Sequence, residues 1–99
     1  MARPELTMAK AYTILSTLGT PRTTYSVRRA LGDEPRKRVK AYLDLLVELG
    51  HIETQGVSEH FTSNREPKLY KTTKLGDAFV SAYQEAEGLL YRPNPIRLW

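Results

Sequence analysis

The apolar residues in the first part of the chain recur at helical spacing. Between residues 7 and 18 they follow the i, i+3, i+4, i+7 pattern of one helix face, at Ala11, Ile14, Leu15 and Leu18. Gly19 and Pro21 end this helix, because proline cannot continue the backbone hydrogen bonding. A second, short helix is expected over residues 25–31, with Thr23 or Thr24 as its N-cap. Its inward-facing residues are Val27, Ala30 and Leu31.

A third helix, over residues 35–49, is the most clearly marked element. Its apolar residues form a single stripe of Val39, Tyr42, Leu43, Leu46 and Leu49. Asp33 or Glu34 is expected to cap its N-terminus, Pro35 suits the first helical position, and Gly50 suits the position just past its end. The residues off the stripe are charged: Arg36, Lys37, Lys40 and Asp44. The rear face is therefore apolar, and the N-terminal part of the outer face is cationic.

Beyond Gly50 the pattern alternates between apolar and polar positions, which predicts two strands, residues 51–55 and 69–72. The polar residues 56–68 between them are expected to form the long tip of a hairpin. Thr73 then caps a fourth helix over residues 74–87, which Gly88 closes. The apolar face of this helix consists of Leu75, Ala78, Phe79, Ala82, Tyr83 and Ala86.

Residues 89–99 are rich in apolar side chains but are interrupted by Pro93 and Pro95. The prolines forbid a regular helix, so an extended apolar tail is expected here. The chain thus divides into a domain of residues 1–88 and a tail of residues 89–99. The fold class predicted is mainly α with a small β-hairpin.

The net charge of +4 is concentrated in the first half of the chain. Residues 22–40 alone contain seven basic and two acidic residues, which is the electrostatic signature of a surface that attracts a polyanion. A solvated basic face without a partner is the alternative. Cations at a helix N-terminus oppose the helix dipole. A bound phosphate or base edge would explain why they gather at the start of helix 35–49.

The sequence carries no pattern typical of an enzyme or a metalloprotein. It has no cysteine, no phosphate-binding glycine loop and no Gly-x-Ser-x-Gly motif. His51 and His60 do not have the spacing of a zinc site. We therefore expect no catalytic residue, no metal and no cofactor. The aliphatic runs are too short to span a membrane, and a cytoplasmic, nucleoid-associated protein is expected.

Two stretches resemble the winged helix-turn-helix proteins, especially the small prokaryotic regulators of the MarR, ArsR and PadR groups. Residues 39–52, VKAYLDLLVELGHI, are similar to the recognition helix of this family running into the first strand of its wing. Residues 70–76, YKTTKLG, are similar to the second wing strand and the cap of the next helix. Thr72 and His51 stand where the family usually has leucine. The resemblance covers residues 6–87 and implies the element order α-α-α-β-β-α.

The resemblance implies a sequence-specific, double-stranded-DNA-binding transcriptional regulator. Helix 35–49 would enter the major groove, helix 25–31 would brace it, and the wing tip 56–68 would lie on the backbone or the minor groove. The residues facing the groove would be Arg36, Lys37, Arg38, Lys40 and Ala41. The residues holding phosphates would be Arg22, Arg28 and Arg29, with Arg65 and Lys68 acting from the wing.

The partners expected are double-stranded DNA and a second copy of the chain. The terminal helices 7–18 and 74–87, together with the apolar tail, would form the interface of a homodimer, although the tail could instead fold back on its own first helix. Such a dimer would place two recognition helices about 34 Å apart. A winged helix that binds protein within a larger assembly is the alternative function. The cationic outer face of helix 35–49 favours DNA.

Overall fold

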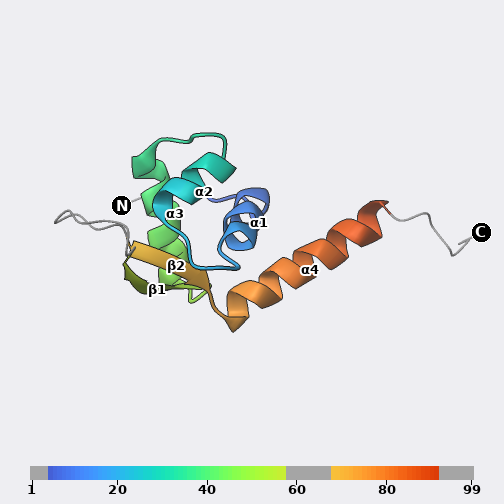
Figure 1. Ribbon diagram of the computed structural model, residues 1–99. Helices are drawn as coiled ribbons and strands as arrows, with labels where there is room; N and C mark the ends of the chain where they lie inside the picture. Colours follow the sequence, from blue (N-terminus) through green and yellow to red (C-terminus); the bar gives the residue numbers. More distant parts are fainter. Residues whose placement is uncertain (1–4, 58–67, 92–99) are drawn as a thin grey trace, which may run out of the picture.

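The computed structural model describes residues 5–57 and 68–91 of the chain (Figure 1). Its elements follow the predicted order: α1 (Met8–Thr17), α2 (Thr24–Ala30), α3 (Arg36–Glu48), β1 (Ile52–Val57), β2 (Lys68–Thr72) and α4 (Lys74–Tyr91). Thr7 is the N-cap of α1, where its hydroxyl accepts a hydrogen bond from the Lys10 amide at 3.1 Å. The fold is mainly α with a two-stranded antiparallel hairpin, as predicted.

The first three helices and the hairpin enclose one hydrophobic core. Its side chains come from the predicted stripes of α1 and α3, from α2 and from the base of the hairpin, among them Ile14, Leu15, Leu18, Val27, Val39, Leu43, Leu46 and Ile52. Two stripe predictions are wrong. Leu49 is 47% exposed, because α3 ends at Glu48 and Gly50, at φ +85°, turns the chain away from the core. Ala30 is exposed at the last position of α2.

The hairpin is joined to the helices by a short third segment that the sequence pattern did not reveal. Ile52 lies opposite Thr72 and Thr54 lies opposite Tyr70 in the antiparallel register. On the other edge of β2, the Arg22 amide donates to the Tyr70 carbonyl at 3.0 Å, and the Tyr70 amide donates to the Arg22 carbonyl at 2.8 Å. The segment between α1 and α2 therefore adds to the sheet and fixes the hairpin against the core.

The start of α4 is anchored to the base of the hairpin. The Thr73 hydroxyl donates to the Gly50 carbonyl at 2.6 Å and accepts from the Gly76 amide at 3.3 Å, which confirms the predicted cap. Thr72 donates to Asp77 Oδ1 at 2.7 Å. Gly76 packs so closely on His51 that a Cβ there would overlap the His51 carbonyl oxygen. Small size at position 76 is thus required by packing.

The predicted end of the last helix is wrong. Helix α4 passes through Gly88 and continues to Tyr91, so Leu89 and Leu90 are helical and not extended. Gly88 lacks the positive φ of a helix-ending glycine, and its destabilising effect of about 1 kcal/mol within a helix is tolerated. Figure 1 shows α4 running from the hairpin past α1 and out beyond the helical body. The predicted extended conformation of residues 92–99 lies outside the described residues.

Candidate nucleic-acid interface

The outer face of α3 carries a group of exposed cations. The buried stripe of Val39, Tyr42, Leu43 and Leu46 fixes how the helix is turned about its own axis. Because the opposite face must then point outward, Arg36, Lys37, Arg38 and Lys40 are all exposed, and Ala41 is half-buried between them and the core. All five residues expected to face a DNA groove thus lie in the N-terminal half of α3, but Arg36 and Arg38, two residues apart, lie on different sides of the helix.

Most of these cations have no anionic partner among the residues that the structure describes. Lys40 lies 3.8 Å from Asp44, one helical turn away, and both side chains are exposed. Such surface pairs contribute about 1 kcal/mol or less and break readily in favour of a stronger partner. Among residues 5–55 and 69–91, Arg36, Lys37 and Arg38 form no ion pair. The positive charge of Arg36 and Lys37 is therefore available to an external anion, whereas that of Arg38 also helps to lower the pKa of the nearby Glu34 carboxyl.

The N-terminus of α3 has no side-chain cap. Pro35 occupies the N-cap position and offers no hydrogen-bonding side chain, and the first turn contains no acidic residue. The expected capping by Asp33 or Glu34 is wrong. Asp33 adopts a φ of +63° in the turn, and the Glu34 carboxylate points to α1. The first amides of α3 and the positive end of its dipole consequently remain open to an anion.

The other predicted contact residues are more scattered. Arg22 and Arg29 are exposed, and Arg29 lies 3.8 Å from Asp33. Arg28 is half-buried, and its Nε donates to the Glu34 carbonyl at 3.0 Å. One edge of its guanidinium thus braces the α2–α3 turn. Lys68 is described only as backbone in β2, and Arg65 lies outside the described residues.

Sequence reasoning missed a partly buried cluster that Lys10 forms beside these cations. Its Nζ lies 2.7 Å from Glu34 Oε1, donates to the Tyr42 hydroxyl at 3.2 Å, and sits 5.4 Å from the centre of the Tyr42 ring. The hydrogen bond to Glu34 raises the pKa of Lys10, and the same bond lowers the pKa of the Glu34 carboxyl. The sequence did contain one indication of this cluster. Lys10 lies one helical turn before Ile14, so it is on the side of α1 that faces the core.

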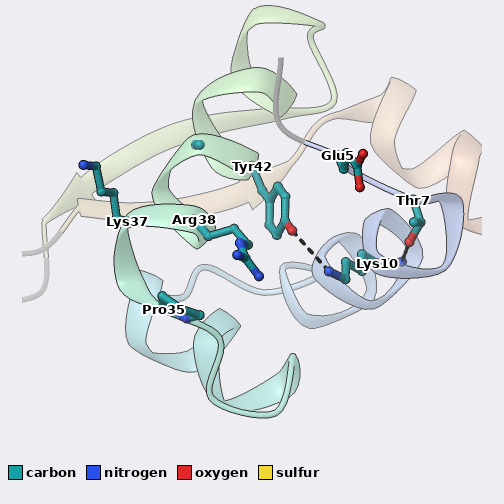
Figure 2. A pocket seen from close by; sticks show the side chains of 8 residues that line it. Glu5, Thr7, Lys10, Pro35, Lys37, Arg38 and Tyr42 are labelled. Carbon is teal, nitrogen blue, oxygen red and sulfur yellow. Dashed lines mark hydrogen bonds between the residues drawn. The ribbon is translucent and has the colours of Figure 1, made fainter. Parts of the chain in front are cut away.

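The Lys10 cluster borders an open hollow between α1 and α3. The hollow is lined by Glu5, Thr7, Lys10, Pro35, Lys37, Arg38, Ala41 and Tyr42. Figure 2 shows Arg38 reaching from α3 toward Lys10 and Tyr42, whereas Lys37 points outward from the helix. Cations at the start of α3 therefore face two directions, one along the outer surface and one into the hollow.

No protein-family model matches the chain, and no curated protein matches it by sequence. Solved structures do match. A PadR family transcription regulator from Clostridium difficile has a TM-score of 0.70 at 15% identity, covering 82% of this chain and 88% of that chain. Sso10a-2, a DNA-binding protein from Sulfolobus solfataricus, has a TM-score of 0.61 at 20% identity, covering 89% and 98%. Bacillus subtilis PadR in complex with operator DNA has a TM-score of 0.56 at 22% identity, covering 92% and 51%.

The fold is a winged helix-turn-helix. Within it, α2 and α3 form the helix-turn-helix, α3 occupies the position of the recognition helix of this fold, and β1 and β2 form the wing. The resemblance read from residues 39–52 and 70–76 is confirmed at the level of fold. In winged-helix terms, the exposed cations gather at the N-terminal end of the recognition helix.

A second exposed surface of this winged helix is apolar and lies along α1 and α4. Tyr12 of α1 stacks on Tyr83 of α4 with ring centres 4.4 Å apart, and the Gln84 amide donates to the Tyr12 hydroxyl at 3.2 Å. Beside this contact runs a groove lined by Met8, Phe79, Ala82, Tyr83, Ala86, Glu87, Leu90 and Tyr91. Met8 is 65% exposed, Leu90 74% and Tyr91 77%. We call this surface the α1–α4 face.

The structure offers no metal site or membrane span within the part of the chain that it describes. No three His, Cys, Asp or Glu side chains of residues 5–57 and 68–91 group closely enough to hold a metal ion. None of the described helices is both long and apolar enough to cross a membrane.

Proposed function

We propose that this chain is a sequence-specific double-stranded-DNA-binding protein that regulates transcription by occupying a site on DNA. One observation carries the proposal: Arg36, Lys37 and Arg38 extend from the uncapped N-terminus of the recognition helix and form no ion pair with any other side chain that the structure describes. A phosphate or base edge satisfies both those cations and the helix dipole. The matching Bacillus subtilis PadR structure, which holds operator DNA, supports this use of the fold.

The proposed contacts are of two kinds, contacts to base edges and contacts to DNA phosphates. Helix α3 enters the major groove, where Ala41 permits close approach and Arg36 reads guanine in bidentate fashion. Arg38 does the same once its side chain turns outward from the hollow. Lys37 and Lys40 complete the groove face. The residues proposed to hold phosphates are Arg22, Arg28, Arg29, Arg65 and Lys68. The Nε of Arg28 is already engaged by the Glu34 carbonyl, so its contact would use the terminal nitrogens.

The test is selection of bound duplexes from a random pool, followed by gel shifts across a salt series. Wild type should enrich one sequence class, with a log-log salt slope of about −0.9 per phosphate neutralised. Arg36→Ala and Lys40→Ala should each weaken binding severalfold. Lys74→Ala removes the same charge from the exposed start of α4 and serves as the control. No enrichment, or equal binding by Arg36→Ala and Lys74→Ala, would contradict the proposal.

We also propose that the chain acts as a homodimer through the α1–α4 face. An apolar groove on α1 and α4, beside a helix end whose Leu90 and Tyr91 are exposed, matches the self-complementary surface that a two-fold axis requires. Residues 89–99 would contribute to the same interface. The dimer would present two recognition helices to an inverted repeat. Protein binding in a larger assembly is less well supported, because the outer face of α3 is cationic.

The proposed role requires neither catalysis nor a cofactor. It places the protein in the cytoplasm of a prokaryotic cell, associated with the nucleoid. The solved structures cited above are named as regulators or DNA-binding proteins, which agrees with a non-enzymatic role.

A further inference from the structure

We propose that Lys10, Glu34 and Tyr42 form a positioning cluster that sets the direction of α3 and so determines how well the protein discriminates between DNA sequences. The inference rests on the proposed DNA-binding function. It concerns residues that touch no DNA in the proposal and act through the recognition helix.

Glu34 is held in place from both sides of the turn that leads into α3. Its backbone carbonyl accepts from Arg28 Nε of α2 at 3.0 Å, and its carboxylate lies 2.7 Å from Lys10 Nζ of α1. The Glu34 side chain is only 14% exposed, and its Oε2 is buried without a hydrogen-bond partner among the described residues. Withdrawing Lys10 would leave a largely covered carboxylate without its counter-ion, which is unfavourable.

The turn between α2 and α3 is closed by backbone hydrogen bonds at the end of α2, and Glu34 ties it to α1. Gly32 and Asp33 both have positive φ values, +79° and +63°. The Gly32 amide donates to the Arg29 carbonyl at 3.2 Å and the Asp33 amide donates to the Arg28 carbonyl at 2.8 Å, which holds this conformation locally. The Glu34 carboxylate then supplies the link to α1. Pro35 and α3 follow directly, so the turn aims the recognition helix.

Tyr42 provides the second point of attachment, within α3 itself. Its ring is 2% exposed, and its hydroxyl accepts from Lys10 Nζ at 3.2 Å (Figure 2). One ammonium group thus fixes both the entry to α3 and a residue two turns into it. Two separated points fix the direction of a rod. Because Lys10 belongs to α1, which also carries Met8 of the α1–α4 face, the cluster ties the direction of α3 to the proposed dimer interface.

Loosening this attachment should affect specific binding more than non-specific binding. Phosphate contacts by flexible cations tolerate small changes in helix direction, whereas base-edge hydrogen bonds depend on placement. We therefore expect the ratio of affinities for a selected duplex and a scrambled duplex to fall when the cluster is broken. The cations of α3 and the salt dependence of non-specific binding should remain.

The decisive variant is Glu34→Gln, because positioning and simple electrostatics predict opposite results. Removing an acid near a polyanion should by charge alone tighten binding to every duplex. Positioning predicts instead that the specific-to-scrambled affinity ratio falls about tenfold, as coupling energies between contacting residues allow. Asp33→Asn removes the adjacent, exposed carboxylate and is the matched control, with an unchanged ratio expected. Lys10→Met should lower the ratio as Glu34→Gln does, and Lys74→Met should not.

A second readout needs no DNA and guards against loss of folding. Amide hydrogen exchange at Arg38 and Val39, which donate to the Pro35 carbonyl at 3.0 and 3.1 Å, should accelerate in Glu34→Gln and Lys10→Met but not in Asp33→Asn. Thermal unfolding monitored by circular dichroism establishes that each variant is folded.

The two proposals fail in different ways. A wild-type protein that enriches no duplex overturns the proposed function. An enriched duplex that Glu34→Gln discriminates as well as wild type overturns the positioning inference and leaves the function standing. If amide hydrogen exchange is faster in Glu34→Gln but the specific-to-scrambled affinity ratio is unchanged, the positioning inference is also overturned. The cluster would then contribute to stability alone.

Discussion

At the scale of single residues, the Lys10–Glu34 pair makes stability depend on pH. The hydrogen bond from Lys10 lowers the pKa of Glu34 below 4.5, so the contribution of this carboxylate is present above pH 4.5 and is lost as the pH falls through the folded-state pKa. The difference in free energy of unfolding between wild type and Glu34→Gln should therefore shrink from pH 7 to pH 3. Urea unfolding across this range measures it.

Asp33→Asn provides the comparison for that pH series, because the Asp33 carboxylate is exposed. The difference in free energy of unfolding between Asp33→Asn and wild type should stay small from pH 7 to pH 3. The pKa of Lys10 is raised from 10.5 by the same hydrogen bond, so the stabilisation persists below pH 10.5 and is lost as the pH rises through the folded-state pKa. A constant difference between wild type and Glu34→Gln from pH 7 to pH 3 would contradict the pairing.

Two glycines of α4 should respond to alanine in opposite directions. At Gly76 the added Cβ meets the His51 backbone, and overpacking of this kind destabilises by about 2 kcal/mol. At Gly88 the added Cβ meets nothing within 4 Å, and replacing glycine inside a helix stabilises by about 0.5 to 1 kcal/mol. Chemical denaturation of Gly76→Ala and Gly88→Ala tests both. Equal stability of the two variants would show that the contact at position 76 is relaxed.

The sequence predicted which residues of α3 are exposed, but not where Glu34 points. The stripe through Val39, Tyr42 and Leu46 fixes the outer face, so the exposure of Arg36 and Lys37 follows from local spacing alone. The contact of Glu34 with Lys10 joins positions 24 residues apart and depends on how α1 packs against α3. The positive φ of Asp33 was not predicted either, because residue preference alone favours a cap at this position, whereas the residue completes the turn that ends α2.

At the scale of the elements, the missing cap of α3 gives a prediction that separates stability from binding. Pro35→Ser and Pro35→Asp both supply a capping oxygen, worth about 1 kcal/mol and partly offset by the loss of proline from the unfolded chain. Only the aspartate adds negative charge where a phosphate is proposed. Pro35→Asp should bind the selected duplex about fivefold more weakly than Pro35→Ser.

Unfolding curves and binding isotherms of the two Pro35 variants provide the measurements. Their stabilities should agree closely, because the cap is the same kind of hydrogen bond. Equal DNA affinities would place the phosphate elsewhere than at the N-terminus of α3.

Element order was more predictable than element ends. Helical and alternating periodicities distinguished the four helices from the hairpin, and Thr73 was correctly identified as a cap. Gly88 was misread, because glycine ends a helix only when the chain turns there, and the apolar residues that follow it continue α4. The segment at Arg22 that pairs with β2 was missed, because a single bridge leaves no periodic pattern.

At the scale of the whole molecule, the α1–α4 face predicts an assembly that can be broken without unfolding the protomer. Leu90→Glu places a charge on the exposed apolar end of α4, outside the core. We expect sedimentation to show a monomer with unchanged helicity, and binding to an inverted repeat to become markedly weaker. Ser81→Glu adds the same charge on the opposite side of α4, nine residues earlier, and should remain dimeric.

A wild type that sediments as a monomer at all practical concentrations would contradict the dimer. The sequence predicted the apolar face of α4, because helical periodicity shows it. The surface that covers this face could not be predicted, because a partner, unlike a core contact, leaves no periodic pattern in the chain.

The way α4 is attached at its start and at its middle has a mechanical consequence for the proposed dimer. Thr73 and Gly76 hold the start of the helix beside the wing, and the Tyr12–Tyr83 stack holds its middle against α1. The helical residues beyond Gln84 extend over only about 10 Å, so a tilt of about 10° there moves the far end by about 2 Å. In the proposed dimer, so short a free end would keep the two α3 helices at a nearly constant separation and would restrict the operator spacings that they can span.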